Sequence, residues 1–425
     1  MTTQDDAIPP AAPAANAPAA SKGNLNFVLV CVFIDMLGIG LIVPVLPVLI
    51  SQFVGTHQGE IGWYGILSST FGLMQFIFMP MLGAVSDRIG RRPVLLYSMA
   101  GMCINFLSTA WAPSLAYLFI GRVVGGMSSA SMSVASAYAS DISTPDTRSK
   151  SFGKVGAAFG LGFICGPALG GLLGGVNIHL PFYVAGALSA ANFVYGYFVV
   201  PESLPPGRRA PIKLARINPF AALLRLVRRT DIRLLVVVFA LVTFAQMMLQ
   251  STWVVYTRLR FDWTTGQNGA ALFCVGISAA VVQAGLLGFL IKRFGEVRLS
   301  LMGLTSGCIV FLGYGLATHG WMMYVLILCN LLSFAVGPAL QGIVSKSTPP
   351  GEQGELMGSL QSISSVGTFI MPYLGNSVIL EWAATLPAND WRIGTTFFLS
   401  AGTQLLAILV ARHYFRAHHL QPKPL

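Results

Sequence analysis

Twelve apolar runs of about 20 residues each limit the possible folds of this chain more than any other feature of its sequence. A helix of that length crosses the ~30 Å hydrocarbon core of a bilayer. Only helices and closed barrels satisfy the backbone inside lipid, and a barrel needs strands of about ten residues that alternate apolar and polar side chains. These runs are longer and continuous, so the sequence predicts an all-α membrane protein with twelve transmembrane helices. The predicted spans are residues 27–50, 63–85, 93–112, 114–138, 151–175, 180–200, 232–256, 267–291, 299–318, 321–344, 356–380 and 393–411.

The charged residues support this class and predict an orientation. Only 10% of the 425 residues are charged, against about 25% in a soluble domain. On twelve spans, 22 of the 26 Lys and Arg residues fall on one side, Arg258, Arg260 and Arg392 lie opposite, and Arg122 lies inside a span. Because cytoplasmic loops carry the excess of Lys and Arg, both termini are predicted to be cytoplasmic. The net charge of +11 then reflects membrane topology and not a nucleic-acid surface.

The longest polar connection divides the chain into two halves of six spans. Its segment Phe220–Arg229 is amphipathic and basic, which fits a helix lying on the membrane surface and fits a solvated linker equally well. The predicted organisation is a disordered cytoplasmic tail (1–24), an N-terminal half (25–200), a cytoplasmic linker (201–230), a C-terminal half (231–413) and a cytoplasmic tail (414–425).

An internal repeat supports this division. The segment Gly83–Gly90, after span two, recurs as Gly288–Gly295 after span eight, at an offset of 205 residues. At the same offset, Gly162–Pro167 of span five matches Gly367–Pro372 of span eleven. Duplicated halves related by an axis along the membrane normal are typical of a large group of secondary transporters, whose substrate site lies near the midplane between the halves.

Two charged side chains, Asp35 and Arg122, lie well inside predicted spans. A charge at the bilayer centre costs about 2.5–3.5 kcal/mol on insertion scales and marks a functional site by default. A carboxyl group that alternately meets water and substrate can load and release a proton, so Asp35 is the candidate for proton coupling. The alternative is that Asp35 only hydrogen-bonds neighbouring helices. Arg122 is predicted to bias the protonation of the site, unless its role is purely structural.

Two further segments have patterns that fit a moving membrane protein. The short turn after span two can lock one access state through its acid and its basic residues, although the basic residues also fix topology. Span five is rich in glycines three or four residues apart, which bring helix backbones into close contact. The residues concerned are Gly83, Asp87, Arg88, Gly90, Arg91 and Arg92 in the turn, and Gly162, Gly166, Pro167, Gly170 and Gly171 in span five.

These segments together resemble the major facilitator superfamily, specifically its twelve-helix drug:proton antiporters and most closely the bacterial tetracycline efflux proteins. The resemblance rests on the order and register of Asp35–Pro47, Ser86–Leu96, Gly121–Arg122 and Phe159–Gly171, and it runs through nearly all spans. It implies a multi-pass protein of the bacterial cytoplasmic (inner) membrane that exports small molecules in exchange for protons. The glycine-proline pattern of span five marks the antiporters more narrowly than the turn motif does.

Three departures from that family bear on the substrate. Asn105, Ala279 and Gly307 stand where the tetracycline exporters usually carry titratable residues, which puts recognition of a metal-chelated tetracycline in doubt. Candidate substrate contacts are therefore mostly neutral, although each can instead be an interhelical hydrogen bond or a lipid contact. These candidates are Gln75, Asn105, Gln246, Gln250, Trp253, Gln283 and Gln341.

The sequence thus predicts a proton-coupled exporter of drugs or other amphipathic small organic molecules, acting as a monomer. The alternative is a proton symporter that takes up a small nutrient or metabolite. No phosphate-binding loop or zinc motif indicates an enzyme, and the six scattered cysteines have no metal-ligand spacing. No cofactor or metal is predicted, and the energy is expected to come from an ion gradient.

Overall fold

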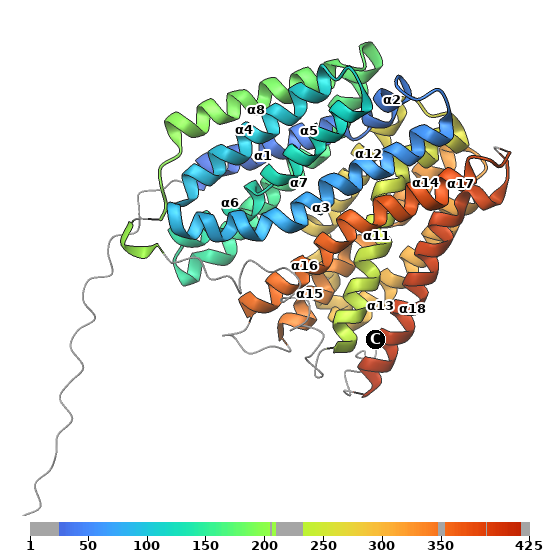
Figure 1. Ribbon diagram of the computed structural model, residues 1–425. Helices are drawn as coiled ribbons and strands as arrows, with labels where there is room; N and C mark the ends of the chain where they lie inside the picture. Colours follow the sequence, from blue (N-terminus) through green and yellow to red (C-terminus); the bar gives the residue numbers. More distant parts are fainter. Residues whose placement is uncertain (1–24, 205, 210–232, 347–352, 388, 418–425) are drawn as a thin grey trace, which may run out of the picture.

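The chain forms a bundle of long helices (Figure 1) in the computed structural model, which describes residues 25–204, 206–209, 233–346, 353–387 and 389–417. The N-terminal half contains α1 (Leu25–Ile42), α2 (Leu46–Ser51), α3 (His57–Ile89), α4 (Arg91–Ala110), α5 (Leu115–Ser128), α6 (Ser131–Ile142), α7 (Pro145–Val176) and α8 (Leu180–Val199), followed by η1 (Pro206–Arg208). The C-terminal half contains α11 (Arg233–Phe261), α12 (Thr265–Ala280), η2 (Val281–Leu286), α13 (Leu287–Leu316), α14 (Gly320–Cys329), η3 (Leu331–Ala335), α15 (Val336–Lys346), α16 (Gln353–Pro372), η5 (Tyr373–Leu380), α17 (Glu381–Ala383), η6 (Trp391–Gly394) and α18 (Thr395–Ala417).

The described helices are long and apolar enough for twelve membrane spans, as predicted. Ten helical stretches are long and apolar enough to span a bilayer, and the bent pair Gly320–Cys329 and Leu331–Val344 makes an eleventh. One of the ten, Thr265–Leu316, has 52 residues, which corresponds to about 78 Å at 1.5 Å per residue. Its helix is interrupted at Gly295, whose φ of 72° and ψ of 160° are not helical. That stretch therefore contains two spans.

Several predicted spans are not the continuous helices that their apolar runs suggested. Span one is split between α1 and α2, because Pro44 lacks an amide donor and restricts the backbone before it. Span four is split between α5 and α6, where the side chain of Gln75 on α3 donates a hydrogen bond to Ser129 Oγ at 2.9 Å. Polar groups at the interruption thus find partners from a neighbouring helix.

The helix ends also differ from the predicted edges, since polar capping residues extend helices beyond the apolar runs. Thr56 accepts a hydrogen bond from the amide of Gly59, so α3 begins six residues before the predicted edge. Thr264 and Gln267 form a capping box at the start of α12. At the C-terminus, α18 continues to Ala417, past the predicted limit of the half at 413. Residues 1–24 and the segment Phe220–Arg229 lie outside the described residues.

The backbone supports the internal repeat. Gly90 and Gly295 occupy equivalent positions in the repeated turn motif, and they are the two glycines with positive φ in the described chain, at 115° and 72°. A positive φ favours glycine because it has no Cβ. The equivalent helices also pack alike: α7 packs on α1 in the N-terminal half, and α16 packs on α11 in the C-terminal half.

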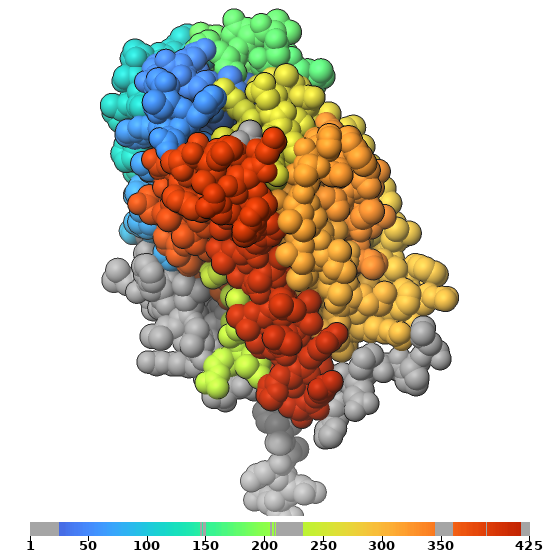
Figure 2. Space-filling model, turned by 90° about the vertical axis from the view of Figure 1, so that its right-hand side faces the viewer, coloured from blue at the N-terminus to red at the C-terminus, as the bar shows by residue number. Residues whose placement is uncertain are grey.

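The two halves meet along helix pairs and then diverge toward one side of the molecule (Figure 1). We call this the basic side; it carries the described chain ends at Leu25 and Ala417 and the turns around Arg91 and Arg293. The opposite, closed side carries the loops after α2, α4, α7, α11, α13 and α17. Figure 2 shows blue segments of the N-terminal half in direct contact with yellow and red segments of the C-terminal half.

Candidate functional site

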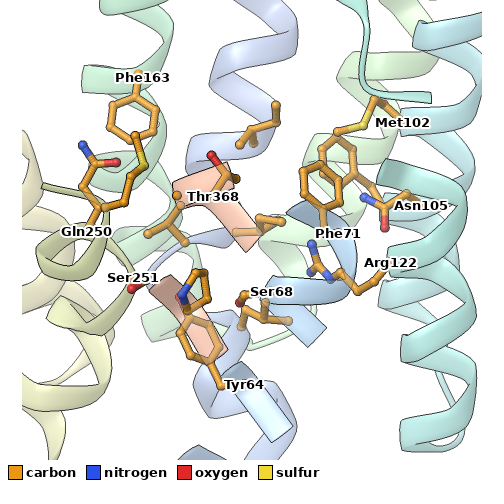
Figure 3. Close-up of a pocket in the computed structure, with 18 residues that line it drawn as sticks. Tyr64, Ser68, Phe71, Met102, Asn105, Arg122, Phe163, Gln250, Ser251 and Thr368 are labelled. Atoms are coloured by element: carbon orange, nitrogen blue, oxygen red, sulfur yellow. The ribbon is translucent and has the colours of Figure 1, made fainter. Parts of the chain in front are cut away.

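A cavity lies between the two halves and is lined from both. Its space amounts to about 950 Å³, part of which is open to solvent. Apolar side chains provide most of the lining, and a few polar groups project among them (Figure 3). The lining residues are Ile39, Ile42, Val43, Leu46, Tyr64, Ser68, Phe71, Met102, Asn105, Phe106, Arg122 and Phe163 from the N-terminal half, with Met247, Gln250, Ser251, Gly367, Thr368 and Pro372 from the C-terminal half.

Arg122 is the one charged residue among these described lining residues. Its guanidinium group projects from α5 toward the cavity (Figure 3). The residue is 5% exposed, and its Nε and Nη2 atoms have no hydrogen-bond partner in the described part of the chain. Its electrostatic neighbour is Tyr64 of α3, whose hydroxyl also interacts with Ser68. A buried, incompletely paired cation of this kind is costly unless a ligand or partner satisfies it.

Asn105 lies beside Arg122 on the neighbouring helix α4. It is fully buried, and neither its Nδ2 nor its Oδ1 atom has a hydrogen-bond partner. Gly125 of α5 makes this approach possible, since a Cβ there would lie 2.6 Å from the Asn105 side chain. Two unsatisfied polar side chains on adjacent helices therefore face one cavity.

Asp35 does not line the cavity. It is 2% exposed and lies among α1, α6 and α8, where Asn192 Nδ2 donates a hydrogen bond to its Oδ1 at 3.0 Å. Its other polar neighbour is Ser131, the first residue of α6 after the interruption of span four. The Oδ2 atom has no hydrogen-bond partner. No contact between Asp35 and Arg122 occurs in the described chain, so this arrangement does not pair the two intramembrane charges.

Of the remaining predicted substrate contacts, one lines the cavity and the others lie elsewhere in the described structure. Gln250 lines the cavity, whereas Gln75 is used in the hydrogen bond to Ser129. Trp253 is 3% exposed and packs edge-on against Tyr314, with ring centroids 5.3 Å apart. Gln246 is half-buried, and Gln283 and Gln341 are exposed, all outside the cavity lining. Of the positions that depart from the family pattern, Ala279 is half-buried outside the lining, whereas Gly307 is buried against Gln404.

One seam between the halves follows the glycine-rich helix α7. Near the closed side, a Cβ on Gly171 would lie 2.6 Å from Thr265 O, and one on Gly269 would lie 2.6 Å from Pro167 O. Farther along, Ile164 contacts Gly276. Toward the basic side, a Cβ on Gly160 or Gly156 would meet nothing within 4 Å. The halves therefore touch near the closed side and separate toward the basic side.

The other predicted glycines of span five pack within the N-terminal half. A Cβ on Gly162, Gly166 or Gly170 would lie within 2.0–2.6 Å of the backbone of α1. Helix α7 continues as one helix through Pro167. One face of α7 thus packs on α1, while another forms the seam with α12.

The second seam runs between α3 and the segment α16–η5. Ser377 Oγ donates a hydrogen bond to Gly62 O at 2.8 Å, and Gly72 packs against the backbone of Thr368. An ion pair joins the halves at the closed end: Arg258 Nη1 lies 2.5 Å from Glu60 Oε1. Glu60 is 4% exposed, so this pair is largely shielded from water. It forms a lock on the closed side.

The turn between α3 and α4 is held inside the N-terminal half. Arg91 lies 2.6 Å from Asp87 and 2.9 Å from Asp141 of α6. Glu202 accepts hydrogen bonds from the backbone amides of Arg91 and Arg92 at the start of α4, and Arg92 also donates to Tyr197 O. The acid of the turn motif, Asp87, therefore contacts an arginine of the same motif within one half.

The predicted residues Gly90, Gly83 and Arg88 of this turn have different surroundings. A Cβ on Gly90 would lie 2.3 Å from Glu202 Oε2. Gly83, by contrast, has only Ser133 Oγ nearby, at 3.7 Å from such a Cβ, so no helix approaches it closely here. Arg88 is exposed.

Sequence reasoning missed several residues of this arrangement. Glu60 and Arg258 lie on α3 and α11, just outside predicted spans two and seven, and they are 198 positions apart, so no local pattern connects them. Asn192 and Tyr64 lie in apolar runs without a motif. A signal was available for Glu60, which is the one acid in the first turn of its long apolar helix.

The fold, the repeat and the central cavity define a membrane transport protein. The family model described as Major Facilitator Superfamily matches residues 28–372, and the chain belongs to this superfamily. Among its relatives is the Escherichia coli tetracycline resistance protein, class C, which is 35% identical over 89% of this chain and 95% of the relative. The class G protein of Vibrio anguillarum is 37% identical over 89% and 96%.

Solved structures of transporters resemble the whole chain. The human organic anion transporter MFSD10 (TETRAN) has a TM-score of 0.69 and 25% identity, covering 91% of this chain and 98% of that structure. The nucleoside transporter NupG has a TM-score of 0.69 at 13% identity, covering 92% of this chain and 99% of that structure, which shows the shared fold alone. The predicted superfamily, the twelve-helix fold and the assignment to transporters and not enzymes are thus confirmed.

Proposed function

We propose that this protein exports drugs or other amphipathic small organic molecules from the bacterial cytoplasm in exchange for protons. The observation that carries the proposal is the cavity between the two halves, sealed by the lock on the closed side and lined by a single buried cation. Its apolar walls with a few directional polar groups suit amphipathic molecules. The relatives support this class of cargo, since two of them are tetracycline resistance proteins.

The basic side is proposed to face the cytoplasm, with both termini there and the protein acting as a monomer in the inner membrane. Described basic residues at Arg91, Arg293 and Arg412 lie on that side, in accord with the excess of Lys and Arg in cytoplasmic loops. A substrate would then enter from the cytoplasm while the closed side is sealed. Separation of α3 from α16 and of α7 from α12 would open the opposite side.

Asp35 is the proposed proton carrier. A carboxylate that is 2% exposed and keeps one oxygen unpartnered is costly in its charged form, so proton uptake would neutralise it. Its neighbour Ser131 begins α6 directly after the interruption of span four. A shift of α6 against α1 would change the solvation of the carboxyl, which couples the proton to the access state.

The test is a transport assay on the purified full-length protein in liposomes with an imposed proton gradient. We expect the wild-type protein to move a tetracycline or a fluorescent dye only when the gradient is present, and Asp35→Asn to bind the same molecule but lose gradient-driven movement. Asp390→Asn, the same chemical change at a partly exposed position on the closed side and away from the cavity, is the matched control. Gradient-driven transport by Asp35→Asn would refute the coupling role.

The alternative is a proton symporter for uptake of a small nutrient or metabolite. The same liposomes distinguish the two directions: with the proton-rich compartment on the closed side, an antiporter moves substrate toward the closed side, and a symporter moves it toward the basic side. The glycine-proline pattern of α7 favours the antiporter.

A further inference from the structure

The lining of the cavity carries a positive charge and no negative charge among the described residues. Its eighteen described lining residues include one cation, Arg122, and neither an acid nor a histidine. Two acids lie four residues before lining residues: Asp35 is engaged by Asn192 and faces α6 and α8, and Glu60 is paired with Arg258. The low-dielectric cavity therefore has a net positive charge that no described side chain neutralises.

The unsatisfied donors lie in one place. Nε and Nη2 of Arg122 and Nδ2 of Asn105 are buried N–H groups that have no hydrogen-bond partner among the residues that the structure describes. Both side chains lie on the same wall of the cavity, with Phe71 beside them (Figure 3). The hydroxyl of Tyr64 adjoins Arg122 as well. A planar guanidinium group presents parallel N–H donors that match the two oxygens of a carboxylate.

The rest of the cavity suits an apolar body. Its lining includes the apolar side chains of Phe106, Met102, Phe163 and Met247, and Phe163 lies across the cavity from Arg122 (Figure 3). A cationic substrate would instead bring like charges together in a medium of low dielectric, which is strongly unfavourable. A neutral substrate would leave the arginine without a counter-ion.

We infer that the cavity binds organic anions, with the carboxylate or an equivalent acidic group of an aromatic substrate held by Arg122 and Asn105. This inference rests on the proposed function, because it names the chemical class of the molecule that the cavity carries. It also gives a physical reason for asparagine at position 105: an amide can donate to a bound anion, whereas an acid would repel the anion and pair with Arg122.

Equilibrium binding to the full-length protein in detergent or nanodiscs tests the inference without any gradient. Three probes share one fluorescent body and differ in charge: dansylglycine, its neutral carboxamide and dansyl-ethylenediamine, which is a cation. We expect dansylglycine to bind at least about tenfold more tightly than the carboxamide, and the cation to bind most weakly. Equal affinity for the anion and the carboxamide, or preference for the cation, would overturn the assignment.

Variants locate the selectivity. Arg122→Gln should lower the affinity for dansylglycine at least about tenfold and leave the carboxamide within about twofold, whereas Arg122→Lys should restore part of the preference. Arg412→Gln, the same change at an exposed position of α18, is the matched control. A preference for the anion that survives in Arg122→Gln would contradict the site. If that variant does not fold, the selectivity of the wild-type protein and of Arg122→Lys still tests whether the cavity prefers anions.

This measurement separates the inference from the proposed function. Preference for the anion without gradient-driven movement would support the site and refute proton-coupled export. Gradient-driven export of the carboxamide and cation, without preference for the anion, would support export and refute the anion site.

Discussion

The closed side and the basic side of the interface between the two halves are built from the same kinds of helix but make opposite contacts. On the closed side, Gly171 and Gly269 bring α7 and α12 into backbone contact, and Glu60 pairs with Arg258 across the halves. On the basic side, Gly156 and Gly160 have open space before them. There the ion pairs of Arg91 stay within one half.

This difference indicates how such a fold can alternate. Close contacts between the halves are glycine-lined and confined to a few helix pairs, whereas contacts within each half involve many more pairs. Because glycines line α7 on both the touching and the separated parts of its seam, the same helix can close at either end. A rigid rotation of one half against the other then exchanges the two sides.

Replacing a glycine on the closed side should have the largest effect on this asymmetry. Gly269→Leu inserts a side chain where a Cβ already lies 2.6 Å from Pro167 O, so it should disfavour the closed arrangement by about 1–3 kcal/mol, a shift of roughly 5- to 150-fold in the equilibrium. Spin labels at positions 58 and 318, both exposed on the closed side, should move apart.

Gly160→Leu is the control for that prediction, since a Cβ there meets nothing within 4 Å. It should leave the distance between the labels unchanged. If Gly160→Leu separates the labels as much as Gly269→Leu does, the description of the two sides as closed and open is wrong.

Removing the lock should have the next largest effect. Glu60→Gln leaves Arg258 without its charged partner, and we expect the closed arrangement to lose about 1–2 kcal/mol, because the neutral amide can keep only a weaker hydrogen bond to the arginine. The same labels report the change. Because the two residues form one interaction, Arg258→Gln should add little to Glu60→Gln; fully additive effects would show that the pair is not coupled.

Breaking a contact on the basic side should lower the stability of the fold without opening the closed side. Asp141→Asn replaces one charged partner of Arg91 with a neutral amide, and the free energy of unfolding should fall by about 1 kcal/mol. Thermal unfolding in detergent measures it. The distance between the closed-side labels should remain as in the wild type, and a clear increase would mean that this cluster also controls the closed side.

The smallest effect is expected at a partly exposed pair on the closed side. Arg392 hydrogen-bonds Asp390 at 2.6 Å and holds the pKa of that carboxyl below its usual range. The stabilisation is therefore present above the ordinary pKa of an aspartate and disappears as the pH falls through the lowered value. Asp390→Asn should slightly lower the melting temperature at pH 7 and have no effect at lower pH, below that value; an equal loss at both pH values would contradict the ionic origin.

The membrane fold and the repeat were accessible from the sequence, because they depend on properties that each segment carries by itself. Run length and apolar character predicted the spans, and the repeated turn was recognised from residues whose backbone later proved alike, Gly90 and Gly295. The interruptions at Pro44 and Ser129 were missed, since an apolar run does not reveal where polar groups from another helix intervene.

The candidate site could be predicted from the sequence only in part. Arg122, Asn105 and Gln250 were predicted and line one cavity, whereas Asp35, singled out by the same reasoning as Arg122, lies away from it. The direction in which a helical side chain points depends on how its helix is rotated against its neighbours. For Asp35 that rotation is fixed by contacts with α6, α7 and α8.

By itself, the sequence determined that this chain crosses a membrane twelve times in two related halves and that it has to accommodate two buried charges. Only the tertiary structure decided that those charges are apart, that Arg122 faces the cavity without an acidic partner among the described residues, and that Glu60 meets Arg258 across the closed side. The physical reason is that hydropathy acts segment by segment, while electrostatic pairing depends on distances between atoms far apart in the chain.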